Sequence, residues 1–400
     1  MTRLGRPVRR VLVAGPGTRF LSGVTYYTFS LCNALDGAYA VSAILMRQLL
    51  PTFLYPGRSR VGADIARLEL RPAIRCFDGV DWYWLPTLLG AVRFLARERP
   101  DVVVLQWWTG TVLHTYLVLA LCARLLGARL VIEFHEVLDT AEAAIPVVGA
   151  YAGAVGRRLA RQADGFVIHS EFDRPALEQT YNLGARPVAV IPHGPYNQYQ
   201  ALPARARRRA APDGACNLLF FGTIRPFKGL EDLVRAFDAI PEGEIEGYWL
   251  TVVGETWEGW TLPGELIAAS RYRDRITFVN HYVRDEEVAA YYAAADAVVL
   301  PYHRSSASGP LHVTMSHGLP VVVTAVGGLV EAAAGYEGAI LVPPRDPMAL
   351  REALRRGAAL KGRRFDDPHS WGRTVARYEA LFDELQDAAR GARNATRRTS

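Results

Sequence analysis

A short stretch in the second half of the chain combines cations with glycine in a way that suits phosphate binding. The segment 222–229, GTIRPFKG, follows an apolar run and contains Arg225 and Lys228. The chain has only two lysines beside 44 arginines, so a lysine in this loop indicates a specific role. Two fixed cations can hold a diphosphate and stabilise the charge that grows on it when a bond breaks. The alternative is a basic loop that is merely exposed to solvent.

A second stretch, residues 305–311 with the sequence SSASGPL, has the features of a helix start. Ser308 or Gly309 can cap a helix, and Pro310 is favoured in the first helical turn. The free backbone amides and the dipole of a helix N-terminus attract a phosphate. Alone, the stretch is better explained as an ordinary capped helix. Together with the 222–229 loop it favours a joint phosphate site.

His135 ends a predicted strand of the first half, within the sequence EFHE of residues 133–136. A polar residue at the end of a central strand is expected to face a ligand rather than the core, although such residues also serve as structural caps. The similar strand end 191–194 carries His193, which we expect at the crossover between the two halves. His135 is therefore the stronger candidate for contact with a substrate.

Ser22 and Gly23 precede a helix predicted over 24–35. Together with the nearby Gly15-Pro16-Gly17 they do not form the GxGxxG pattern, and no acidic residue follows at the required distance. A dinucleotide fold is therefore not indicated. The pair would still let a ligand approach the backbone closely, and a simple loop with a helix cap explains it equally well.

Short apolar runs alternate with longer helical patterns through both halves of the chain. Strands are expected at 11–14, 41–46, 102–106, 130–134, 166–169 and 188–191, and again at 218–221, 250–253, 276–279, 297–300, 321–324 and 340–342. Because these runs are continuously apolar, helices should cover both faces of each strand, which indicates parallel sheets. The pattern predicts an α/β chain of two Rossmann-like, doubly wound domains facing a cleft, with ligands beyond the carboxyl ends of the strands.

Composition places the domain boundaries. We expect a first domain over 1–198, a linker rich in Ala, Arg and Pro over 199–216, a second domain over 217–365, a helix over 366–389 and a disordered basic tail over 390–400. In the last helix, apolar residues from Trp371 to Leu385 recur at steps of three and four, which gives the helix one apolar face.

The net charge of +6 comes from three arginine-rich segments without acidic residues, 3–10, 205–209 and 390–398. Without their twelve arginines the chain has 34 basic and 40 acidic residues, a balance of −6. This balance gives no basic groove for nucleic acid, so we expect no nucleic-acid partner. The arginine segments are expected to be solvated, with weak peripheral contact to a membrane surface as the second choice.

The cysteine pattern and the apolar runs bear on location. Four cysteines lie far apart without a CxxC pair, which excludes a zinc knuckle and a disulfide scaffold and favours a reducing, cytoplasmic setting. The run 11–14 is too short for a signal peptide. The longest apolar stretch, 112–126, contains His114 and Arg124 and falls short of a membrane span, so we expect a buried helix there.

Taken together, the motifs resemble the retaining nucleotide-sugar glycosyltransferases of the GT-B fold, glycosyltransferase family 4. The likeness is strongest from Asn217 to Leu350, in FFGTIRPFKGLEDLVRAF, LTVVGE, YVRDEEVAAYYAAADAVVLPY, SGPLHVTMSHGLPVVVTAVGGLVE and GAILVPPRDPMAL. The first half matches more loosely, through Ser22-Gly23 and EFHE. Each motif alone is common, and the set from the second half is specific.

The resemblance implies transfer of a sugar from a nucleoside diphosphate sugar with retention of anomeric configuration. The second domain would bind the nucleotide and the first the acceptor, with Arg225 and Lys228 on the diphosphate, His135 on the donor sugar, and the last helix crossing back onto the first domain. The substrate-binding residues that it implies are Ser22, Gly23, Gly222, Ser308, Gly309, Pro310, Leu311 and Tyr282. No cofactor beyond the donor is implied, and the acceptor is a glycan, a lipid-linked sugar or a small metabolite.

Two features qualify this expectation. No Asp-x-Asp occurs in the chain, so the usual carboxylate clamp for a catalytic metal is missing and a metal-free site is expected. Many members of the family carry two glutamates at positions that align with Ser305 and Val313. Valine cannot accept hydrogen bonds from a ribose, so the alternative is a partner protein that binds a nucleotide sugar with impaired catalysis. A sugar-nucleotide epimerase lacks support because no acid/base pair is evident.

Overall fold

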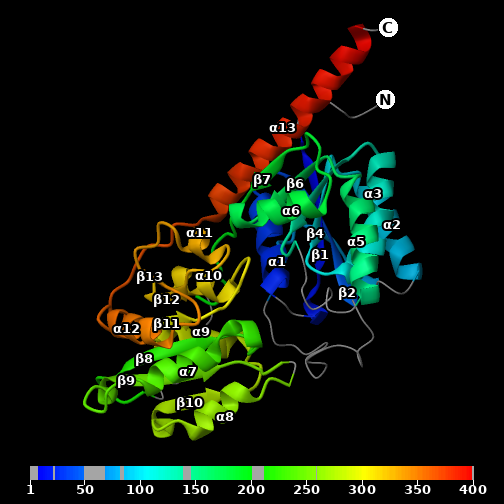
Figure 1. Cartoon of the computed structure of the whole chain (residues 1–400). Helices are drawn as coiled ribbons and strands as arrows, with labels where there is room; N and C mark the ends of the chain where they lie inside the picture. The colour runs from blue at the N-terminus through cyan, green and yellow to red at the C-terminus, as the bar shows by residue number, and fades with distance from the viewer. Residues whose placement is uncertain are drawn as a thin grey trace. The chain divides into compact units, whose positions relative to one another are not determined.

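The computed structural model describes residues 8–20, 23–48, 68–81, 85–137, 146–200, 211–257 and 259–398 (Figure 1). The described residues divide into two compact units. The first contains the described residues up to Gly194 together with those from Trp371 onward, and the second spans Pro195–Ser370. The expected domain boundary at 198 thus lies four residues beyond the observed division, and residues 201–210 of the expected linker lie outside the described residues.

The first unit is built on a parallel sheet whose seven described strands run in the order β3-β2-β1-β4-β5-β6-β7. The strands are β1 Arg10–Pro16, β2 Ala40–Gln48, β3 Arg75–Asp81, β4 Val102–Trp107, β5 Arg129–Phe134, β6 Gly165–Ile168 and β7 Val188–Val190. The strand order reverses between β1 and β4, which is where open parallel sheets place their ligands. Every residue of β4 is buried, as expected for a strand covered on both faces.

The described helices of the first unit are α1 Gly23–Leu35, α2 Leu85–Glu98, α3 Leu113–Leu125, α5 Pro146–Ala160, α6 Arg174–Thr180 and α13 Trp371–Arg398. The stretch 112–126, expected to be buried, forms α3 but is buried on one side only. Tyr116 and Leu119 are fully buried, whereas Leu121 and Leu125 are 56% and 78% exposed. A helix that covers one face of a sheet buries only one stripe of its side chains. None of the described helices is both long and apolar enough to cross a membrane.

The last helix, α13, contributes to the core of the first unit although it follows the whole second unit in the chain. Tyr378, Leu381, Phe382 and Leu385 are buried. Gly194 lies against the indole of Trp371, and a Cβ at this glycine would fall 2.6 Å from the ring. The helix continues to Arg398, so the expectation of a disordered tail over 390–400 is wrong for residues 390–398. Alanine and arginine, which are frequent there, are among the best helix formers.

The second unit has a parallel sheet whose described strands run in the order β10-β9-β8-β11-β12-β13. The strands are β8 Cys216–Phe221, β9 Tyr248–Val253, β10 Ile276–Val279, β11 Ala297–Leu300, β12 Val321–Thr324 and β13 Ala339–Val342. The helices are α7 Leu230–Asp238, α8 Leu262–Ala269, α9 Asp285–Ala294, α10 Gly309–Ser316, α11 Leu329–Ala333 and α12 Pro347–Ala358. The order reverses between β8 and β11, so ligands are expected where these two strands end.

All strands expected from the sequence are present, and the structure adds β3. This strand reads RCFDGVD and lies at the edge of the first sheet, with mostly exposed or half-buried side chains. An edge strand with charged residues has no continuous apolar run, so the pattern used for the other strands does not detect it.

Candidate active site

The 222–229 loop begins where β8 ends and lies tightly against the end of β9. Gly222 has a φ of +129° and donates its N–H to the carbonyl of Val253, at 3.0 Å. A side chain at Gly254 would overlap the backbone of Gly222, including its carbonyl oxygen. The two glycines therefore allow neighbouring strand ends to approach closely, and Gly222 is held in a conformation that other residues rarely adopt.

The rest of the loop forms one turn of 3-10 helix, Pro226–Lys228, which Arg225 precedes as the N-cap and Lys228 ends. The N–H of Lys228 donates to the carbonyl of Arg225, at 2.9 Å. Gly229 has a φ of +63°, and a Cβ there would overlap the carbonyl oxygen of Pro301, directly after β11. This contact presses the turn against the segment that follows the neighbouring strand. Both cations are therefore placed at the point where the strand order reverses.

Aromatic rings hold these two cations in place. The Lys228 ammonium lies 3.7 Å from the centroid of the Tyr302 ring, and the Arg225 guanidinium lies 4.9 Å from that of Phe227. Within the described parts of the chain no carboxylate forms an ion pair with Lys228. Since the face of an aromatic ring does not use the N–H donors fully, the ammonium keeps hydrogen-bonding capacity for an anion.

The predicted helix start is present as α10, which begins at Gly309. Ser308 is its N-cap, and its hydroxyl oxygen accepts a hydrogen bond from the N–H of Leu311, at 3.3 Å. The ring of Pro310 would lie 3.5 Å from a Cβ placed on Gly222. The structure therefore brings the 222–229 loop and the start of α10 together, as expected for a joint phosphate site.

Three other positions were singled out in the second half. Ser305 donates its hydroxyl to the carbonyl of Ala307, at 2.7 Å. Val313 is buried within α10. Tyr282 follows β10, two strands away from β8 in the sheet order, and is half-buried. Neither Ser305 nor Val313 offers a carboxylate, so the described loops present cations and amides without a paired acid.

In the first unit, Gly23 is the first residue of α1, and Ser22 lies outside the described residues. The nearby Gly15, in β1, has no space for a side chain, because a Cβ there would overlap the side chains of Gln106 and Thr28. These two side chains are hydrogen-bonded to each other. The close packing lies where the order of the first sheet reverses, at the ends of β1 and β4.

His135 belongs to a cluster of three histidines. It directly follows β5, His169 directly follows β6, and His193 lies three residues after β7. The three rings are at least 92% buried, and their centroids lie 4.1–5.6 Å apart. His169 Nε2 lies 3.2 Å from His135 Nδ1, and His169 Nδ1 lies 2.8 Å from the carbonyl oxygen of Ile191.

The contacts of His169 determine which nitrogens carry protons. A carbonyl oxygen can only accept, so His169 Nδ1 donates to Ile191. His169 Nε2 is then the acceptor for the N–H of His135 Nδ1. The lone pair of His135 is then on Nε2, a buried atom that has no hydrogen-bond partner in the described structure. Burial lowers the pKa of His135 well below its ordinary value, and His169 lowers this pKa further. His135 is thus a neutral hydrogen-bond acceptor.

A buried carboxylate lies beside this cluster. Glu133 is fully buried in β5, accepts a hydrogen bond from the Tyr378 hydroxyl at 2.6 Å, and accepts another from the Gln106 amide at 3.2 Å. One of its oxygens lies 3.7 Å from His169 Nε2. Burial raises the pKa of Tyr378, and the charge of Glu133 raises this pKa further. Tyr378 therefore stays a proton donor to Glu133.

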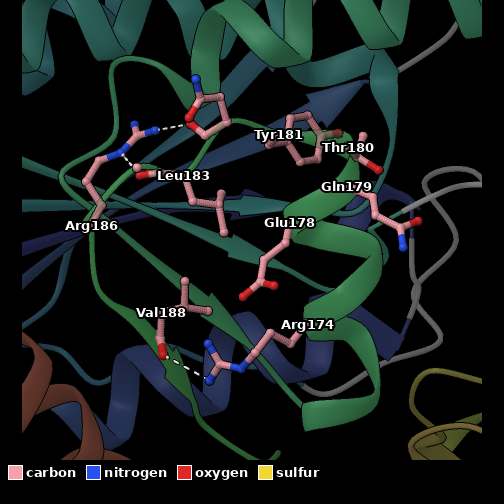
Figure 2. Close-up of a pocket in the computed structure, with 10 residues that line it drawn as sticks. Arg174, Glu178, Gln179, Thr180, Tyr181, Leu183, Arg186 and Val188 are labelled. Atoms are coloured by element: carbon pink, nitrogen blue, oxygen red, sulfur yellow. Dashed lines mark hydrogen bonds between the residues drawn. The ribbon is translucent and has the colours of Figure 1, made fainter.

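A pocket of about 580 Å³ lies elsewhere in the first unit, between α6 and the segment that leads to β7 (Figure 2). Its two arginines already bind protein groups. Arg186 donates to the carbonyl of Leu183 and Arg174 to that of Val188 (Figure 2). Arg186 also donates to the carbonyls of Ala160 and Ala163, and Arg174 forms an ion pair with Glu171. This pocket therefore lacks a cation that is available to a phosphate, and it contains none of the residues predicted from the sequence.

Known families match both units of the chain. Residues 22–194 match the family described as "Glycosyl transferase 4-like domain", and residues 215–359 match "Glycosyl transferases group 1". The chain belongs to glycosyltransferase family 4. This glycosyltransferase is 30% identical over 356 residues to a D-inositol 3-phosphate glycosyltransferase of Kineococcus radiotolerans, an alignment that covers 82% of this chain and 76% of the relative.

Solved structures agree with the two-unit fold. Sucrose-phosphate synthase of Thermosynechococcus elongatus matches with a TM-score of 0.63 at 19% identity, over 98% of this chain and all (100%) of that one. Anabaena Alr3699/HepE in complex with UDP-glucose matches with a TM-score of 0.58 at 15% identity, over 96% and 99% of the two chains. The glycosyltransferase thus has the two Rossmann-like domains of the GT-B fold.

Sequence reasoning did not select His169, Tyr27 or Tyr378 for the site in the glycosyltransferase. His169 ends one of the expected strands, so the rule that drew attention to His135 would also have found it. The two tyrosines, whose hydroxyls lie 3.5 Å apart, belong to α1 and α13 and are 351 residues apart in the sequence. No local signal links such distant positions.

Proposed function

We propose that this glycosyltransferase moves a sugar from a nucleoside diphosphate sugar to an acceptor hydroxyl, with retained anomeric configuration and without a catalytic metal. The main support is that the 222–229 loop and the start of α10 lie together where the strand order of the second sheet reverses. This arrangement offers two cations and a helix N-terminus to one anion.

The chemistry needs such a site because breaking the bond between the sugar and the diphosphate leaves negative charge on the phosphate. Arg225 and Lys228 would neutralise that charge, while the amide of Gly309 and the dipole of α10 would add to it, since the N–H of Leu311 is already bonded to the Ser308 cap. The residues are preorganised by aromatic rings and glycine turns, so little rearrangement is needed as charge develops. No Asp-x-Asp is present to hold a metal for the same purpose.

We assign His135 to contact with the donor sugar. Its Nε2 carries a buried lone pair without a partner in the described structure, and a sugar hydroxyl is a suitable donor to such an atom. The family likeness supports the same assignment. By this proposal His135 acts on the sugar and not on the nucleotide.

For the acceptor, we propose a small polyhydroxylated metabolite ahead of a glycan or a lipid-linked sugar. The support is the name of the relatives, D-inositol 3-phosphate glycosyltransferase, at 29–30% identity. The donor proposal is supported by the UDP-glucose in the structure of Anabaena Alr3699/HepE. A panel of donors and of cyclitol, sugar and lipid-linked acceptors, scored by mass spectrometry of products, tests both.

The second candidate function is binding of a nucleotide sugar with impaired catalysis, which Ser305 and Val313 favour. One experiment separates the two candidates. Calorimetry with UDP, GDP and ADP measures binding, and product formation with the matching sugar donors measures transfer. Binding with transfer supports our proposal, and binding without either transfer or donor hydrolysis supports the alternative. NMR of the product at the anomeric carbon then tests retention.

A further inference from the structure

The first unit places one histidine at the end of each of three adjacent parallel strands. The strands β5, β6 and β7 are neighbours in the sheet, and His135, His169 and His193 follow them at the same edge. One ring nitrogen from each residue lies within 4.8 Å of the other two. Because each imidazole is positioned by its own strand, the sheet itself brings the three rings together.

The spacing suits a metal ion with tetrahedral coordination. Zinc–imidazole bonds of about 2.0–2.1 Å in a tetrahedron place neighbouring nitrogens roughly 3.3 Å apart. His135 Nδ1 and His169 Nε2 lie 3.2 Å apart. In the metal-free protein the proton of His135 Nδ1 lies between these atoms. When an ion takes its place, this proton moves to His135 Nε2, so that the ring stays neutral. The ligand nitrogens of all three residues lie within 4.8 Å of one another, so at least one ring must rotate to complete the coordination.

The surroundings of the cluster resemble the outer shell of a metal site. His169 Nδ1 donates to the Ile191 carbonyl, which leaves Nε2 free to coordinate and fixes the ring. The ring of Tyr27 contacts all three imidazoles, with centroids 4.6–5.3 Å away. Glu133 lies 3.7 Å from His169 Nε2 and provides negative charge in a buried place.

We propose that His135, His169 and His193 bind a divalent transition metal ion of the zinc type, with one coordination position left for water or a substrate oxygen. Neutral imidazoles favour zinc, cobalt, nickel and copper, whereas magnesium and calcium require oxygen ligands. The alternative is that the three histidines only form hydrogen bonds within the protein and bind no metal, and the experiment below distinguishes these two possibilities.

This site goes beyond the proposed transfer reaction and competes with it. His135 is our candidate for accepting a donor-sugar hydroxyl at Nε2, and an ion bound to Nδ1 would leave Nε2 protonated and unable to accept that hydrogen bond. Bound metal should therefore slow transfer, and removal of the metal should leave transfer unchanged or faster. The site would make the enzyme sensitive to the transition metal content of its surroundings.

The test measures metal binding directly, without donor or acceptor, so its outcome is independent of the proposed function. Cobalt(II) is titrated into the metal-free full-length chain, and the visible absorption of tetrahedral cobalt is recorded. We expect one cobalt per chain, displaced by zinc. The variants His169→Ala and His193→Asn should each weaken binding at least tenfold, and the control His281→Asn, an exposed histidine of the second unit, should not.

A measurement on the unaltered protein guards against variants that fail to fold. Zinc K-edge absorption of the loaded wild-type chain counts the imidazole ligands, and we expect three. Absence of the tetrahedral cobalt spectrum, fewer than three imidazoles on zinc, or equal binding by the folded variants and the control would overturn the proposal.

Discussion

Replacing Lys228 with alanine tests the phosphate site most directly. The ammonium lies over the ring of Tyr302 and has no ion pair with a described carboxylate, so its charge is available to a substrate. Two unit charges about 4 Å apart attract by about 4 kcal/mol at an effective dielectric constant of about 20. Lys228 is half-buried, and water screens part of this attraction. We therefore expect a loss of ~2–3 kcal/mol of transition-state stabilisation, in line with the loss of one donor to a developing charge.

This loss corresponds to a fall in kcat of about 30–150-fold, since each ~1.36 kcal/mol is a factor of ten. The assay is product formation at saturating donor, with donor binding measured separately by calorimetry. The other lysine, Lys361, provides a matched control. Its Nζ donates to the carbonyls of Gly214 and Ala215, at 2.9 and 2.7 Å, so Lys361→Ala should lower the unfolding temperature and leave kcat within twofold.

The fold of the Lys228→Ala variant should survive, because a cation–π contact of this kind contributes about 0.5–2 kcal/mol. Lys228→Arg keeps the charge and should recover part of the rate. If the alanine variant turns over within a factor of two of the parent, or if the Lys361 control loses as much activity, the assignment of Lys228 to the diphosphate is wrong.

Three further outcomes follow from the described contacts. His135→Ala should lower kcat at least tenfold while the Kd for the bare nucleoside diphosphate stays within twofold, and weakened binding of the bare nucleotide would argue against contact with the sugar. Tyr378→Phe removes a hydrogen bond to the buried Glu133 and should reduce the free energy of unfolding by about 1.5–3 kcal/mol, measured by urea denaturation; an unchanged midpoint would mean that water replaces the hydroxyl. Transfer should persist in excess EDTA, because Arg225 and Lys228 take the place of a metal, and loss of activity restored by magnesium would show that the phosphate site was misread.

The second half of the chain was predictable in detail because its signals are local. The 222–229 loop and the start of α10 are each recognisable within eight residues, and each follows an apolar run that forms a strand. Their convergence follows from the rule that the carboxyl ends of parallel strands share one edge. The cation–π contact between Lys228 and Tyr302 depends on side-chain placement, which no local pattern specifies.

The first half was less predictable because its site depends on contacts between distant segments. His135, His169 and His193 are 34 and 24 residues apart along the chain and meet only because β5, β6 and β7 are adjacent. The buried Glu133 requires a partner from α13, more than 240 residues away. Sequence reasoning found the strand that carries Glu133 but had no means of finding the tyrosine that binds it.

The position of α13 has a consequence for how the chain folds as it leaves the ribosome. Residues 195–370 contain every strand of the second sheet, so the second unit can complete its core before synthesis ends. The first unit cannot, since Tyr378, Phe382 and Leu385 belong to its interior and are synthesised after the whole second unit. The first unit therefore cannot complete its core until α13 has been synthesised. Until then the carboxylate of Glu133 lacks the hydroxyl of Tyr378 as its partner. In a chain that stops before residue 371, the first unit would lack α13, although all its described strands have been synthesised. The apolar surface that α13 covers would then be exposed to proteases and chaperones.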